Sequence, residues 1–106
     1  MTLTIMGLKT CDTCRKAIRA LPDATFRDIR TQPLTAAERA AFWEIFGDKL
    51  INRASSTWRN LTPGQQTIAP DTLLAEHPAL MKRPLITDST TATLGWTPAQ
   101  QAQWLD

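Results

Sequence analysis

Residues 2–21 read TLTIMGLKTCDTCRKAIRAL and contain a short strand followed closely by a helix. Apolar residues alternate with threonines before Gly7, and this alternation predicts a β-strand over residues 2–6. Apolar side chains then recur three and four positions apart, which predicts an amphipathic helix over residues 13–21. Pro22 ends this helix because proline disfavours the helical conformation in the residue before it.

A second strand and a longer helix follow. Residues 25–29 alternate apolar and polar side chains, so we predict a strand that lies parallel to the first and completes a βαβ unit. The sequence Thr35-Ala-Ala-Glu38 has the spacing of a capping box, which predicts a helix from here to Gly47. We expect its apolar face to consist of Leu34, Ala37, Ala41, Phe42, Ile45 and Phe46.

The remaining elements are short. We predict helices over residues 48–52 and 71–77, an antiparallel hairpin of strands 84–88 and 91–94, and a last helix over 98–105 with Ala102 and Leu105 facing inward. The order β-α-β, helical insert, β-β-α is that of a thioredoxin-like (glutaredoxin-like) α/β fold with a mixed sheet. We therefore expect a single domain, 1–106, with a core of residues 1–33 and 83–106 and a helical insert of residues 34–82.

The composition is that of one ordinary globular domain. The chain has 106 residues, of which 42% are hydrophobic and 21% charged, a balance that excludes disordered and collagen-like chains. The net charge of +2 is too small to indicate a direct nucleic-acid partner. No apolar run reaches the ~18 residues of a membrane span, and the first residues lack the features of a secretory signal. We therefore expect a cytoplasmic protein with no membrane partner, and a monomer because no exposed apolar stripe is apparent.

The chain contains two cysteines, Cys11 and Cys14, and one histidine, His77. A structural zinc site needs four ligands, so this count argues against a metal site. In a reducing compartment, a Cys-x-x-Cys pair is more typical of a catalytic or redox-sensing function than of a structural disulfide. We expect His77, which precedes a proline at a predicted helix end, to interact with helix carbonyls there.

The predicted structure places both thiols at the start of the first helix. Cys11 lies where unpaired backbone N–H groups and the helix dipole favour the thiolate, the nucleophilic form. Lys9, Arg15 and Lys16 lie close in sequence and can add to this effect. Cys14 lies one turn further on the same face, where it can resolve an adduct on Cys11 by closing a disulfide. In the alternative interpretation, Cys14 is only a small hydrophobic residue of the core.

Four segments of the chain together resemble the ArsC/Spx family, most closely its short YffB-type branch. They are Cys11-Asp-Thr-Cys14-Arg15-Lys16-Ala17, Phe26 to Thr35, Asn52 to Arg59, and His77 to Ile86. These segments occur in order and span nearly the whole chain. The resemblance implies a thioredoxin-like fold with a helical insert, in agreement with the predicted order of elements.

The resemblance also implies roles for individual residues. Cys11 is expected to be the nucleophile, and Pro84 the cis-proline beside it. Arg59 and Arg83 match arginines that bind an oxyanion in the arsenate reductases of this family, a task that suits the guanidinium group. The third arginine of those enzymes is missing from residues 94–97. Arg15 and Arg53 are the candidates to replace it, and we include Arg15 in the predicted anion site.

Three functions are compatible with these residues. The first is a cytosolic, thiol-dependent oxidoreductase that uses glutathione or another small thiol as co-substrate and holds no bound cofactor. The second is an arsenate reductase coupled to glutaredoxin. The third is a redox-sensing regulator of the Spx type that binds RNA polymerase, although we expect such a regulator to extend further beyond the last helix.

Overall fold

The computed structural model describes residues 2–105 and divides into two compact units. The first unit comprises Met1–Thr31 and Arg83–Asp106, and the second comprises Gln32–Lys82. The boundaries predicted from the sequence lie after residues 33 and 82, so the first differs by two residues and the second agrees. Within residues 2–105, no helix is long and apolar enough to cross a membrane.

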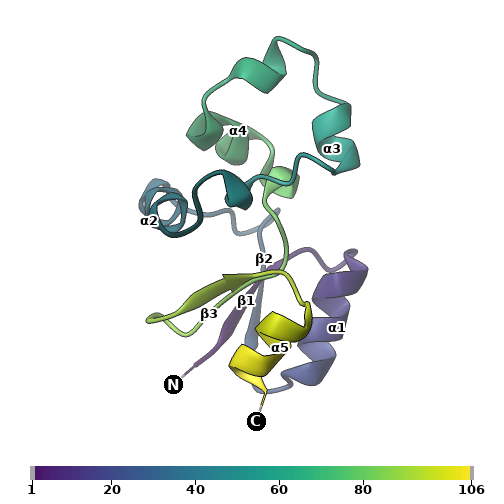
Figure 1. Cartoon of the computed structure of the whole chain (residues 1–106), viewed down its shortest axis with the longest axis vertical. Coiled ribbons are helices and arrows are strands. Elements are labelled where there is room, and N and C mark those ends of the chain that lie inside the picture. Colours follow the sequence, from purple (N-terminus) through teal and green to yellow (C-terminus); the bar gives the residue numbers. More distant parts are fainter. Residues whose placement is uncertain (1, 106) are drawn as a thin grey trace. The chain divides into compact units, whose positions relative to one another are not determined.

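The first unit contains a four-stranded sheet with the strand order β2-β1-β3-β4 (Figure 1). The strands are β1 (Thr4–Gly7), β2 (Thr25–Asp28), β3 (Leu85–Thr87) and β4 (Ala92–Leu94). Strand β1 pairs in parallel with β2 and antiparallel with β3, and β3 pairs antiparallel with β4. The predicted mixed sheet, with its βαβ unit and its hairpin, is therefore confirmed.

Helices α1 (Asp12–Ala20) and α5 (Pro98–Trp104) cover one face of this sheet. Ile5 and Ile86 are register partners on β1 and β3, and both are almost fully buried. Ala17 and Leu21 from the α1 segment pack against them, as the helical periodicity predicts. The partly buried residues around this cluster are Leu3, Ile18, Ala24, Phe26, Trp96 and Trp104.

The prediction for the inward face of α5 is wrong. Ala102 is exposed, and 40% of Leu105 is exposed. Trp104 occupies the inward position instead, and its indole Nε1–H donates to the Thr93 hydroxyl at 2.8 Å. A tryptophan buries more apolar surface than an alanine and needs a partner for its N–H. Both needs are met when α5 turns Trp104, and not Ala102, toward the sheet.

The second unit is helical. It contains α2 (Ala36–Phe46), α3 (Ser56–Arg59) and α4 (Pro70–Glu76), with 3₁₀ turns at Gly47–Leu50, Gln65–Thr67 and Pro78–Leu80. The predicted capping box is present at the start of α2, where Glu38 N–H donates to Thr35 and Thr35 N–H donates to Glu38. An ion pair of 2.7 Å between Arg39 Nε and Asp71 Oδ1 joins α2 to α4.

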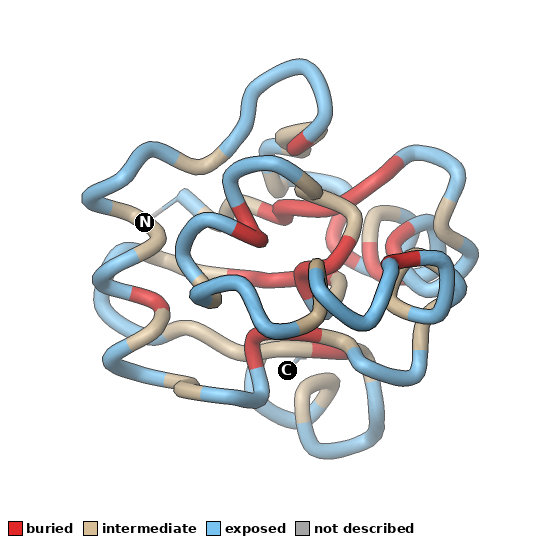
Figure 2. Tube along the Cα trace, turned by 90° about the horizontal axis from the view of Figure 1, so that it is seen from above, coloured by how far each residue is buried: buried red, intermediate tan, exposed pale blue. Residues whose placement is uncertain are grey.

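The predicted apolar face of α2 is only partly correct. Phe42 is buried, but Ala37 and Ala41 are exposed, and 59% of Ile45 is exposed. These three residues lie four positions apart and so form one row along α2. The row lies on a different side of the helix from the buried Phe42. Figure 2 shows how the buried residues are distributed along the chain.

Candidate active site

Cys11 is the N-cap residue of α1. Its backbone is extended, with φ −87° and ψ 120°, and its carbonyl accepts the first helical hydrogen bond from Arg15 N–H at 3.0 Å. A tight turn precedes it, closed by Cys11 N–H donating to the Leu8 carbonyl at 3.1 Å. The predicted position of Cys11, between the first strand and the first helix, is confirmed.

Cys14 lies fully buried one turn into α1, with 0% of its surface exposed. A Cβ atom on Gly7 would lie only 2.4 Å from Cys14 Sγ, far closer than two such atoms can approach. Glycine is therefore required at the end of β1 because the buried thiol occupies the space that any other side chain would take. The sequence pattern predicts Gly7 only as the end of a strand, and its place shortly before a Cys-x-x-Cys segment is the one signal of this contact.

The surroundings of Cys11 favour its thiolate. Burial opposes ionisation, but hydrogen bonds from the Cys14 backbone N–H, from the Cys14 S–H and from the Arg83 guanidinium outweigh it. The positive charge of Arg83 acts in the same direction. Together they hold the pKa of Cys11 below its ordinary value of 9.0. A thiol with a lowered pKa is ionised to a greater extent near neutrality and is the better nucleophile at that pH.

The surroundings of Cys14 have the opposite effect. Burial, together with the nearby sulfur of Cys11, raises the pKa of Cys14 to about 12, although a hydrogen bond from Leu8 N–H acts against this. Cys14 is therefore a neutral thiol, and its S–H group donates a hydrogen bond to the Cys11 sulfur. Both cysteines are free rather than joined in a disulfide.

Arg83 and Pro84 stand at the entrance to β3, in the same unit as the cysteines. The peptide bond between them is cis, which is what the family resemblance implies for Pro84. Pro84 is buried, and its carbonyl accepts a hydrogen bond from Gly95 N–H at 2.9 Å. The structure thus brings together three of the predicted site residues: Cys11, Cys14 and Arg83.

Arg15 lies beside the cysteines, but its guanidinium is engaged by the protein itself. Its Nε–H donates to the Lys9 carbonyl at 2.8 Å, and its Nη1 lies 3.6 Å from a carboxylate oxygen of Asp12. The predicted role of Arg15 in anion binding stays a prediction.

The other predicted arginines belong to the helical unit. Arg59 is exposed at the end of α3, and its Nη1 donates to the Ala54 carbonyl at 2.6 Å. Arg53 lies over the Trp58 ring at 5.1 Å and pairs with Asp48 at 3.2 Å. The Arg53 guanidinium thus contacts two groups of the protein, the Trp58 ring and the Asp48 carboxylate. Arg59 has a single described partner, the Ala54 carbonyl.

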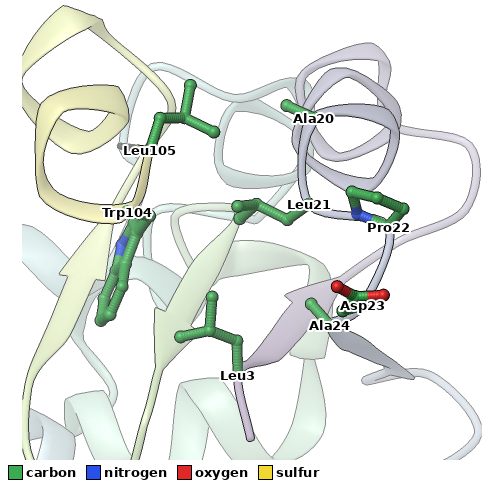
Figure 3. Close-up of a pocket in the computed structure, with 8 residues that line it drawn as sticks. All are labelled: Leu3, Ala20, Leu21, Pro22, Asp23, Ala24, Trp104 and Leu105. Carbon is green, nitrogen blue, oxygen red and sulfur yellow. The ribbon is translucent and has the colours of Figure 1, made fainter. Parts of the chain in front are cut away.

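A pocket of about 290 Å³ lies at the other end of α1 (Figure 3). Its walls come from the C-terminal end of α1, the turn after it, the first residues of the chain and the end of α5. Its lining residues are Leu3, Ala20, Leu21, Pro22, Asp23, Ala24, Trp104 and Leu105. Because neither cysteine lines it, this pocket is separate from the thiol pair. Among residues 2–105, no three His, Cys, Asp or Glu side chains gather as metal ligands would.

Known proteins resemble this chain in sequence and in fold. An uncharacterized protein of Haemophilus influenzae is 35% identical to this chain, and the match covers 89% of this chain and 90% of the relative. Among solved structures, the YFFB protein superposes with a TM-score of 0.83 at 25% identity, covering 99% of this chain and 100% of its own.

An ArsC-related protein from Brucella melitensis superposes with a TM-score of 0.76 at 30% identity, covering 100% of this chain and 96% of its own. These neighbours confirm the predicted ArsC-type, thioredoxin-like fold. The pattern of the ArsC family matches residues 6–104, which include both cysteines, Arg83 and Pro84. The chain belongs to the ArsC family.

Proposed function

We propose that this protein is a cytoplasmic thiol-disulfide oxidoreductase that uses glutathione, with Cys11 as its nucleophile. The observation that carries the proposal is the difference between the two thiols. Cys11 has a lowered pKa at the start of a helix, whereas its neighbour Cys14 is buried and keeps its proton. Cys11 is therefore the attacking thiol, and Cys14 donates a hydrogen bond that stabilises the Cys11 thiolate.

The reaction begins with a mixed disulfide between a substrate thiol and glutathione. The Cys11 thiolate attacks the glutathione sulfur, the bond to the substrate sulfur breaks, and the substrate leaves as a thiolate that takes up a proton. A second glutathione, as its thiolate, then attacks the glutathione sulfur on Cys11. The products are glutathione disulfide and the free Cys11 thiolate, so the two electrons that reduce the substrate come from glutathione.

The high pKa of Cys14 favours this external route. A thiol with a pKa of about 12 supplies almost no thiolate near neutral pH, and the thiolate is the attacking species. Cys14 is therefore a slow competitor for the second step. Arg83 suits glutathione because it places a guanidinium at Cys11 while the tripeptide carries two carboxylates.

The test is glutathione-dependent reduction of a glutathionylated peptide by the wild type, Cys11→Ser and Cys14→Ser. We expect Cys11→Ser to abolish turnover and Cys14→Ser to retain a glutathione-dependent fraction. Equal loss in both variants would show that Cys14 is essential and that the external route is wrong. Failure of the wild type to turn over would end the proposal.

The contribution of Arg83 has a matched control in the preceding residue. Arg83→Gln removes a hydrogen bond and a positive charge from Cys11, so we expect the thiolate fraction at pH 7 to fall as the pKa of Cys11 rises toward its ordinary value. Lys82→Gln removes the same charge from the neighbouring exposed position and should leave Cys11 unchanged. Equal effects of the two substitutions would mean that only net charge matters.

Arsenate reduction is the second candidate. The observation in its favour is Arg83 beside a nucleophilic cysteine in an ArsC-family chain. Against it stand the missing third arginine and the engagement of Arg15 by Lys9 and Asp12. Steady-state arsenate reduction with glutathione and glutaredoxin decides between the candidates, because turnover no faster than that of Cys11→Ser excludes arsenate as the substrate.

A further inference from the structure

The start of α1 is built differently from the starts of α2 and α3. Helix α2 begins with a complete capping box, and α3 begins with the Ser55 hydroxyl accepting from Trp58 N–H at 3.2 Å. Within the described residues, Cys11 makes no such side-chain capping bond to α1 as a thiol, and the Cys14 N–H stabilises its sulfur only in the ionised form. Its sulfur is a weak acceptor as a thiol, so the segment that presents the nucleophile needs another way to stay in place.

Arg15 makes a hydrogen bond to the loop before α1. Its Nε–H donates to the Lys9 carbonyl at 2.8 Å and so connects the second turn of α1 back to the loop before it. This bond spans six residues and closes a loop of chain that contains both cysteines. The same side chain, which is 54% exposed, also lies 3.6 Å from Asp12 in the first turn.

The bond from Arg15 acts on the backbone that places the Cys11 sulfur. Lys9 lies within the turn that Cys11 N–H and the Leu8 carbonyl close. The lowered pKa of Cys11 requires its sulfur to stay near the Cys14 N–H, the Cys14 S–H and Arg83. Holding the turn therefore holds the thiol within reach of the groups that stabilise its charge.

We propose that Arg15 is a positioning residue. Its guanidinium donates a hydrogen bond to the Lys9 carbonyl and thereby holds in place the turn that precedes Cys11. This inference rests on the proposed function of Cys11 as the nucleophile. It assigns to Arg15 a bond within the protein rather than direct binding of a substrate anion. The geometry of the guanidinium is essential to this role because one planar group reaches both Lys9 and Asp12.

Two substitutions separate geometry from charge. Arg15→Lys keeps the positive charge beside Cys11 but loses the planar group, whereas Arg15→Gln loses both. Arg19→Lys is the matched control because Arg19 is an exposed arginine one turn further along the same helix. Melting temperature is recorded for all variants, so that any general loss of stability is visible.

The first measurement is the rate at which iodoacetamide, a neutral reagent, alkylates Cys11 at pH 7. It requires no enzyme assay and is interpretable even if the proposed function fails. We expect Arg15→Lys and Arg15→Gln to slow alkylation by similar factors, about two- to fivefold for an exposed interaction of this kind, and Arg19→Lys to have no effect. In parallel, hydrogen exchange of the Cys11 amide, which closes the turn, should accelerate in both Arg15 variants.

The second measurement is turnover of the glutathionylated peptide. A positioning role lowers kcat in both Arg15 variants and leaves the KM for glutathione unchanged. Loss confined to Arg15→Gln, or a raised KM, would show that charge or direct anion binding is what matters and would overturn the inference. Unchanged alkylation and amide exchange in both variants would overturn it as well. Slower alkylation in both Arg15 variants, together with no turnover by the wild type, would instead contradict the proposed function.

Discussion

Helices α1 and α2 both begin after an extended residue, but one start is specialised for stability and the other for reactivity. Thr35 and Glu38 satisfy each other's backbone N–H groups at the start of α2. At the start of α1 the equivalent position is Cys11, whose sulfur has backbone and side-chain donors directed at its charged form. The Cys11 thiolate therefore accepts from a backbone N–H at the start of α1, as the Thr35 hydroxyl does at the start of α2. Each of the following predictions tests this contrast.

The largest effect is expected from charging the buried thiol beneath the start of α1. The folded state raises the pKa of Cys14 from 9.0 to about 12, so the folded chain keeps a proton that the unfolded chain loses. The stability linked to this proton is fully present below pH 9 and is lost as the pH rises toward 12, by up to about 1.4 kcal/mol per pH unit.

Urea unfolding at a series of alkaline pH values measures this slope. In Cys14→Ala the slope should be shallower, whatever the stability of the variant at neutral pH. The chain has no tyrosine to titrate in the same range. Parallel slopes in the two proteins would mean that Cys14 ionises as easily in the folded state as in the unfolded one.

The next effect concerns the space that Gly7 leaves for Cys14. Gly7→Ala places a methyl group 2.4 Å from the Cys14 sulfur, and the resulting overpacking should cost about 1–3 kcal/mol. Gly64→Ala is the control, because the nearest atom to its new methyl group is 3.9 Å away. Equal unfolding free energies for the two variants would show that the buried thiol moves aside freely.

A smaller effect is expected at the start of α2. Thr35→Ala removes the hydroxyl that accepts from Glu38 N–H and should cost about 1 kcal/mol. The same substitution at the exposed Thr72, inside α4, removes no cap and should change stability by less than about 0.5 kcal/mol. The alkylation rate of Cys11 should be the same in both, and a change in Thr35→Ala would mean that the two helix starts are not independent.

The smallest effect has an unusual sign. Cys11→Ser abolishes the nucleophile but places a preferred N-cap residue at the start of α1, so we expect a gain of about 0.5–1 kcal/mol in the unfolding free energy. The gain should be largest at acidic pH, where Cys11 is a thiol, and should shrink above its lowered pKa as the thiolate accepts the same hydrogen bonds. A loss of stability at every pH would contradict the contrast between the two helix starts.

The sequence predicted the local patterns well and the long-range contacts poorly. Residues 2–29 and the capping box at Thr35 contain their own signals, namely alternation, helical spacing and a hydroxyl three residues before a glutamate. The buried side of α2 and the inward side of α5 depend on which other elements pack there, so the sequence pattern places Ile45 and Leu105 on the wrong side.

For the candidate site, the position of Cys11 followed from the strand and helix signals around it. The contact between Gly7 and Cys14 did not, because it depends on how closely β1 approaches the first turns of α1. The bond from Arg15 to Lys9 was equally hidden, because a backbone carbonyl has no signature in the sequence.

The protein prepares Cys11, and not Cys14, as a thiolate. The pH dependence of Cys11 alkylation in the folded wild type, with the modified cysteine identified by mass spectrometry, measures this difference. We expect a midpoint below 9.0 for Cys11, with Cys14 unmodified over the same range. A midpoint at or above 9.0, or alkylation of Cys14 before Cys11, would contradict it.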